Sequence, residues 1–103
     1  VTTQLSTYEE CNRRQVFQNI EQQAAITRAW GDAYGYLLVA TGRAEVMIDP
    51  IFNVWDAAAI LPVIQESGGI FTDWKGVATV HHQEGIATNG HCHAEILAFT
   101  RNA

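Results

Sequence analysis

The clearest structural signal in the chain is the stretch from Trp55 to Gly69, WDAAAILPVIQESGG. It is rich in apolar residues and good helix formers, and it closes with two glycines, which end helices readily. The sequence therefore predicts a helix over 55–67, with Pro62 inside it. Small side chains at 57–59 leave room for a neighbouring element to approach closely.

Shorter segments on both sides alternate between helical and extended patterns. Helices that alternate with short strands indicate an α/β domain, with a small mixed sheet on which the helices pack. No internal repeat or linker divides the chain, so it is predicted to form a single domain. The further predicted helices are 6–24, 33–41 and 91–99, and the predicted strands are 26–30, 45–48, 70–72, 77–80 and 86–88.

Local signals set several of these boundaries. Two overlapping S/T-x-x-E capping boxes at 6–10 predict the start of the first helix. Asp32 is expected to cap the helix over 33–41. The segment 73–76 is typical of a turn, so 70–80 is predicted to form a β-hairpin.

The composition excludes several functional classes. Charged residues make up 17% of the 103 residues, the formal net charge is −5, and Lys75 is the only lysine. Binding to nucleic acid or to an anionic membrane surface needs clustered Lys and Arg, so we expect neither. No apolar run reaches the ~18 residues of a membrane span. Cys11 and Cys92 lie far apart in the sequence, which favours a reducing, cytoplasmic location.

Three polar residues, Asp49, Asn53 and Asp56, surround the predicted strand-to-helix junction. Local structure explains part of this pattern, because Asp49 suits a turn and the helix dipole stabilises a carboxylate at Asp56. A site for a hard divalent cation is the alternative. Mg²⁺ binds oxygen ligands and keeps several waters, so one or two carboxylates and a phosphate can complete its site. The spacing alone leaves both interpretations open.

The histidines and cysteines are candidates for a metal site and for a reactive thiol. His81 and His82 would point to opposite faces of a strand, and His91 and His93 would diverge by about 200° on a helix. Solvent-exposed histidines are therefore favoured over a metal site. A thiol at Cys92 near a helix N-terminus can have a lowered pKa, but no base is evident beside it. The tryptophans are expected to anchor the core or an interface: Trp30, Trp55 and Trp74.

The stretch from Trp55 to Gly69 also resembles the signature of a known family. WDAAA at 55–59 and QESGG at 65–69 are similar to the W-D-x-A-A … E-A-G-G motif of inositol monophosphatase-like, metal-dependent phosphatases. Ser67 departs from the alanine that is usual there, which is a change of one small residue for another.

Further motifs extend this resemblance from about Ser6 to Phe99. The residues at 28–36 and 39–45 fit the family. Their R-x-W-G-D form, together with the D-P-x-x-N-x-W-D form at 49–56, is closest to the histidinol-phosphatase branch.

One family motif is missing from the chain. The family's glutamate followed by D-P-[ILV]-D-G-T supplies most metal ligands and activates the attacking water. The only D-P here is Asp49-Pro50, and D-G-T does not follow it. The resemblance therefore implies the C-terminal half of an inositol-monophosphatase-type fold, as one subdomain over residues 1–103. These residues contain no certain catalytic group and are predicted to be inactive alone.

The resemblance assigns roles to the positions that match. Asp56 corresponds to the family's metal-binding aspartate, and Mg²⁺ is the implied cofactor. Asp32 and Ala33 correspond to a substrate-contacting segment at a helix N-terminus, where backbone N–H groups suit an oxygen-rich ligand. Asp49 corresponds to the position that contacts the non-phosphate part of the substrate. In histidinol, it could pair with the amine, with Asn53 as a hydrogen-bond partner.

The implied function is Mg²⁺-dependent hydrolysis of a small phosphomonoester, with histidinol phosphate, an intermediate of histidine biosynthesis, as the first choice. An inositol or sugar phosphate is the alternative substrate. A different alternative is a truncated, non-catalytic domain that self-associates through an exposed apolar face. A homo-oligomer is expected for the enzyme as well.

Overall fold

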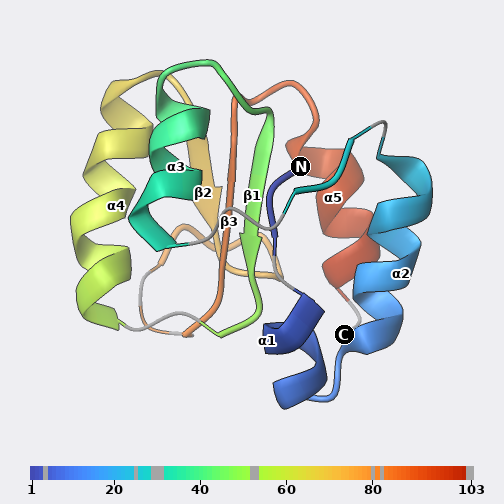
Figure 1. Ribbon diagram of the computed structural model, residues 1–103. Helices are drawn as coiled ribbons and strands as arrows, with labels where there is room; N and C mark the ends of the chain where they lie inside the picture. The colour runs from blue at the N-terminus through green and yellow to red at the C-terminus, as the bar shows by residue number, and fades with distance from the viewer. Residues whose placement is uncertain are drawn as a thin grey trace.

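The computed structural model describes residues 1–3, 5–24, 26–28, 32–51, 54–79, 81 and 83–101; for Thr7, residues 32–34 and Val54 it describes only the backbone. Figure 1 shows a small sheet between two layers of helices. The predicted α/β class is confirmed. In chain order the elements are α1 (Leu5–Glu10), α2 (Arg14–Gln23), α3 (Asp32–Ala40), β1 (Val46–Asp49), α4 (Val54–Glu66), β2 (Ile70–Thr72), β3 (Gly85–Thr88) and α5 (His93–Thr100).

The sheet has the strand order β1-β3-β2, and both pairs are antiparallel. Among the described residues, Thr2 forms isolated parallel bridges with Met47 and with Arg28, outside the three strands. The backbone N–H of Thr2 donates to the carbonyl of Val46 at 2.8 Å. The three strands of the sheet are therefore antiparallel rather than mixed as predicted, and the parallel bridges of Thr2 lie outside them. Of the strand predicted over 26–30, the described residues form only the bridge at Arg28.

Each face of the sheet has its own apolar core, because side chains along a strand alternate between faces. Val46 and Ile48 of β1 pack with α2 and α5, whereas Met47 packs with α3 and α4. On β3, Ile86 and Ala87 divide between the two cores in the same way. This alternation fixes the direction in which each side chain at the end of β1 points.

The single helix predicted over 6–24 is wrong, because the structure divides it between α1 and α2. Asn12 lies between them with a left-handed φ of 63°, a conformation that asparagine adopts more readily than most residues. The N–H of Arg13 donates to the carbonyl of Tyr8 at 2.7 Å, which closes α1. The break lets the ring of Tyr8 meet Phe17 edge-on, with centroids 5.3 Å apart.

The hairpin predicted over 70–80 is also wrong. β2 pairs with β3, and the described residues 77–79 form no strand. The cause is the buried side chain of Asp73, whose Oδ1 accepts hydrogen bonds from the N–H groups of Lys75 at 2.9 Å and Val77 at 2.8 Å. The N–H groups of Lys75 and Val77 are therefore bound to the side chain of Asp73 and are not available for pairing with β2.

The predicted helix over 55–67 is confirmed as α4, with Pro62 inside it. Gly68 follows with a φ of +86°. Gly69 lies so close to β3 that a Cβ would come within 2.6 Å of the carbonyl oxygen of Thr88. The helix predicted over 33–41 is likewise confirmed as α3, and Gly42 follows it with a φ of +78°.

Candidate functional site

The candidate site lies where three elements meet at one end of the domain. Figure 1 shows β1 ending at the lower end of the view, where α3 and α4 both begin. Asp49 is the last residue of β1, and Asp56 lies in the first turn of α4. The topology therefore brings the two carboxylates to the same end of the sheet, although seven positions separate them in the sequence.

The side chain of Asp49 is held by a residue that the sequence did not single out. The hydroxyl of Tyr36, on α3, donates a hydrogen bond to Oδ2 of Asp49 at 2.8 Å. Burial, and then the charge of Asp49, raise the pKa of Tyr36 well above its usual value, so the phenol stays protonated. A buried tyrosine hydroxyl usually has a polar partner, and this was the one signal that could have drawn attention to Tyr36.

Asp56 is exposed, so its carboxylate can reach a ligand from solvent. Carboxylate oxygens suit a hard cation such as Mg²⁺, and the residue therefore fits the ligand type that the family resemblance implies. Within the described part of the chain, no group of three or more His, Cys, Asp or Glu could hold a metal ion. Asp56 therefore fits the role of a single ligand, without a set of three such side chains around it in the described part of the chain.

The remaining predicted site residues are placed only in part. α3 begins at Asp32 and includes Ala33, so both lie at the helix N-terminus as expected, but their side chains lie outside the described part. Asn53 and Trp30 lie outside the described residues altogether.

The expectation of exposed histidines is wrong for His93. This side chain is 6% exposed, and its ring lies between the hydroxyls of Thr72 and Thr88, at 2.7 and 3.0 Å. α5 begins at His93, so the ring packs back against β2 and β3. His81 and His91 are exposed as expected, and His82 lies outside the described residues.

The tryptophans divide between two environments. Trp74 is 1% exposed and belongs to the core, as predicted. Trp55 is 80% exposed, so it is not part of the core of this domain. Whether it anchors an interface stays a prediction.

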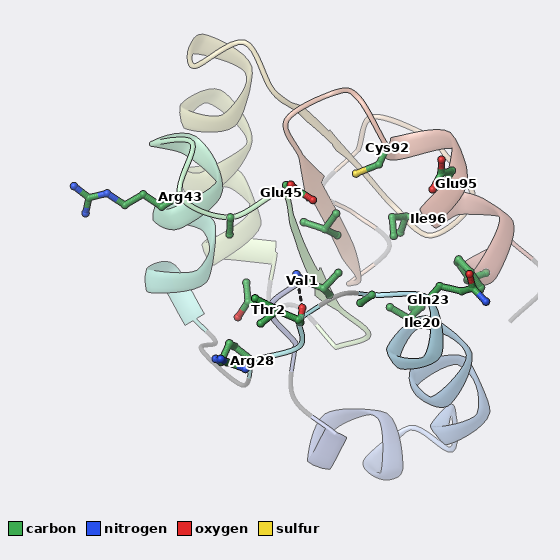
Figure 2. A pocket seen from close by; sticks show the side chains of 15 residues that line it. Val1, Thr2, Ile20, Gln23, Arg28, Arg43, Glu45, Cys92, Glu95 and Ile96 are labelled. Atoms are coloured by element: carbon green, nitrogen blue, oxygen red, sulfur yellow. Dashed lines mark hydrogen bonds between the residues drawn. The ribbon is translucent and has the colours of Figure 1, made fainter.

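A groove of about 620 Å³ lies between α2, α5 and the start of β1, away from the candidate site. Figure 2 shows Glu45, Cys92 and Glu95 along one side, and Arg43 pointing away from the opening. Burial, and then the charges of Glu45 and Glu95, raise the pKa of Cys92, which argues against a reactive thiolate. The groove and the candidate site lie at opposite ends of β1, because the groove includes Val46, the first residue of the strand, and Asp49 is the last.

None of the helices in the described part of the chain is long and apolar enough to cross a membrane.

Comparison with known proteins identifies the family. The model of the inositol monophosphatase family matches residues 1–103, the whole of the sequence. The chain belongs to this family. A structure of an inositol monophosphatase from Zymomonas mobilis matches 96% of the chain with a TM-score of 0.85 and 26% identity. The fold predicted from the resemblance is confirmed.

Curated histidinol-phosphatases also match. The chain is 45% identical over 65 residues to a histidinol-phosphatase of Chlorobaculum parvum, a match that covers 63% of the chain. It is 35% identical over 95 residues, 92% of the chain, to a histidinol-phosphatase of Streptomyces coelicolor. The matches span 25% and 36% of these two relatives, and 40% of the Zymomonas mobilis structure.

The two halves of the family motif have different structural roles in this chain. Asp56 presents a carboxylate at the start of α4, whereas the glycines at the end of α4 let the chain turn and pack against β3. Ser67, the departure from the motif, donates to the carbonyl of Ile64 at 2.8 Å and so adds one hydrogen bond to the last helical turn.

Proposed function

We propose that the protein that contains this chain is a Mg²⁺-dependent phosphomonoesterase, and that histidinol phosphate is its substrate. The observation that supports this most directly is the match to two histidinol-phosphatases at 45% and 35% identity. The end of the domain where Asp49 and Asp56 lie has the acidic character that a metal and a cationic amine require.

Asp56 is proposed to bind Mg²⁺ through its exposed carboxylate. When bound, Mg²⁺ supplies charge neutralisation at the phosphate and a more acidic water. The other ligands are proposed to come from a segment with the D-P-x-D-G-T motif, because this sequence has none and spans a minor part of its relatives. Residues 1–103 alone are then expected to release no phosphate.

Asp49 is proposed to bind the alcohol part of the substrate. A carboxylate attracts the protonated amine of histidinol, and Asn53 would add a hydrogen bond. Asp32 and Ala33, at the start of α3, are proposed to contact the substrate where backbone N–H groups are available to its oxygens.

An inositol or sugar phosphate is the second candidate substrate. A match to a fructose-1,6-bisphosphatase/inositol-1-monophosphatase of Thermotoga maritima, at 35% identity over 60 residues, favours it. A neutral polyol would meet Asp49 through hydrogen bonds rather than through charge attraction, and this difference separates the two candidates.

The experiment is a Mg²⁺ titration of phosphate release by the intact protein and its Asp56→Asn variant. Loss of one charged ligand is expected to raise the half-saturating Mg²⁺ concentration roughly a hundredfold or to abolish turnover. Glu66→Gln is the matched control, because Glu66 is an exposed carboxylate at the opposite end of α4. An Asp56→Asn variant with the wild-type titration would show that Asp56 is not a ligand.

A further inference from the structure

The side chain of Asp49, at the end of β1, lies on a defined face of the sheet. Side chains alternate along the strand, so Asp49 shares the face of Met47, which packs with α3 and α4. The hydroxyl of Tyr36 meets it there, with its oxygen 2.8 Å from Oδ2. The bond joins residues thirteen positions apart and ties the end of a strand to the middle of a helix.

Tyr36 is itself rigidly held. It is 1% exposed and belongs to the core between the sheet and α3 and α4. Its ring packs against Phe71 of β2, with centroids 6.0 Å apart and planes at 48°. A tyrosine has only two side-chain torsions, so a packed ring places the hydroxyl oxygen at a nearly fixed point.

The phenol can act only as a donor toward Asp49 across the ordinary pH range. Burial and the neighbouring charge of Asp49 both raise the pKa of Tyr36. A phenol that keeps its proton can donate it to the carboxylate, as the 2.8 Å contact with Oδ2 shows. A hydrogen bond to a charged acceptor is stronger than one between neutral groups, so this contact restricts the carboxylate effectively.

We propose that Tyr36 is a positioning residue that determines substrate specificity: it holds Asp49 by Oδ2, so that the carboxylate faces the alcohol part of the substrate in one orientation and selects an alcohol with a protonated amine. This inference rests on the proposed role of Asp49. Tyr36 acts through Asp49 and need not touch the substrate.

The chain supplies a matched control in Tyr8, which is also fully buried. The oxygen of Tyr8 lies 2.7 Å from Oγ1 of Thr3, and that hydroxyl donates its own proton to the carbonyl of Ile48 at 2.7 Å. Tyr8 is therefore the donor to Thr3. Tyr8→Phe removes a buried phenol hydrogen bond of similar length but leaves the bond between Tyr36 and Asp49 in place.

The experiment is a double-mutant cycle in the intact protein, with Tyr36→Phe, Asp49→Asn and the pair. For each variant, kcat and KM are measured with histidinol phosphate and with inositol 1-phosphate at saturating Mg²⁺. Tyr36→Phe is expected to raise KM for histidinol phosphate about tenfold with little change in kcat, and to change the values for inositol 1-phosphate by less than about threefold. The double variant should be no worse than Asp49→Asn, because Tyr36 acts only through Asp49.

Two further variants separate positioning from a general loss of structure. Tyr8→Phe should lower thermal stability by as much as Tyr36→Phe and leave both KM values within about twofold of wild type. Phe71→Leu keeps the phenol but loosens the packing of its ring, and it should raise KM for histidinol phosphate by a smaller factor than Tyr36→Phe does.

The outcomes distinguish this inference from the proposed function. If the two losses multiply in the double variant, or if Tyr8→Phe raises KM equally, Tyr36 is not a positioning residue. If wild type prefers inositol 1-phosphate, the proposed substrate is wrong. In that case the selection of a protonated amine is wrong as well; non-additive losses on the preferred substrate then support only the positioning of Asp49 by Tyr36, and additive losses overturn that too.

Discussion

His93 and Thr72 form a hydrogen bond whose direction is set by the second contact of the threonine. Nε2 of His93 lies 2.7 Å from Oγ1 of Thr72, and that hydroxyl donates its proton to the carbonyl of Asp73 at 2.8 Å. Nε2 must therefore carry the ring proton, and Nδ1 accepts from the hydroxyl of Thr88 at 3.0 Å. The buried ring is neutral, and it joins α5 to two strands of the sheet.

This arrangement predicts a stability that falls in mild acid. Burial lowers the pKa of His93 below its ordinary value of 6.5. Below pH 6.5 the unfolded chain then binds a proton that the folded chain resists, so the His93 contribution is fully present above that pH and is lost as the pH falls. Urea denaturation of wild type and His93→Asn between pH 7.5 and 5.5 measures it.

At pH 7.5, His93→Asn is expected to cost about 2 kcal/mol, from two buried hydrogen bonds of ~1 kcal/mol each. This difference should shrink as the pH falls. His91→Asn is the control, because His91 is exposed and its substitution should change the stability by less than about 0.5 kcal/mol. A difference between wild type and His93→Asn that is constant with pH would contradict the neutral, buried ring.

Gly69 is predicted to be sensitive to the smallest possible substitution. A Cβ there would lie 2.6 Å from the carbonyl oxygen of Thr88 and 3.0 Å from Cγ2 of Ile64. The first contact is backbone and cannot turn aside, so Gly69→Ala should destabilise the fold by about 1–3 kcal/mol in urea denaturation.

Ser67→Ala is the control for Gly69, because Ser67 is an exposed residue that also lies between α4 and β2, and its substitution removes only one partly buried hydrogen bond. It should cost less than about 1 kcal/mol. Equal losses of stability in the two variants would show that the close approach of Gly69 to β3 is not the reason why alanine destabilises the fold there.

Most of the fold could be predicted from local patterns. The helix α4 could be predicted because its apolar run ends in Gly68 and Gly69. Gly68 has a positive φ, and Gly69 packs closely against β3. β1 and α3 followed in the same way from short apolar segments that end at Pro50 and Gly42. Signals of this kind lie within a few residues of the element that they define.

The errors arose where a distant or side-chain contact decides the structure. The first helix breaks because Asn12 adopts a left-handed conformation, and the expected hairpin is lost because Asp73 binds the backbone after its own turn. Neither event changes the apolar pattern. The hydrogen bonds of His93 and of Tyr36 likewise join different elements, with partners 21 and 13 positions apart, so local spacing could not reveal them.

The site was predictable only through the family resemblance. Spacing left open a turn-forming role for Asp49 and a helix-dipole role for Asp56 beside a role in binding. The structure adds that both lie at one end of the sheet, and that Asp49 has a fixed donor in Tyr36. Their roles in metal and substrate binding stay predictions.

The helix pair α3 and α4 is predicted to cause self-association when these 103 residues are studied alone. Leu37, Trp55 and Val63 on these helices are 54%, 80% and 47% exposed. Large exposed apolar side chains on neighbouring helices favour association. Size-exclusion chromatography over a range of concentrations should show oligomers, and a hydrophobic dye should bind.

Leu37→Ser with Val63→Ser should reduce both signals. Val77→Ser is the control, since Val77 is 53% exposed but lies outside these helices. A monomer at every concentration, with no dye binding, would contradict the prediction. Homo-oligomerisation of the intact protein is a separate prediction that the same chromatography tests.

The most direct test of the proposed function is the specificity of the intact protein before and after the charge of Asp49 is removed. The measurement is the ratio of kcat/KM for histidinol phosphate to kcat/KM for inositol 1-phosphate, in wild type and in Asp49→Asn, at saturating Mg²⁺. The ratio should exceed one in wild type and fall at least about thirtyfold in Asp49→Asn, because the substrate amine loses its charged partner. A ratio that is unchanged by Asp49→Asn would contradict the assignment of Asp49 as the residue that recognises the cationic alcohol.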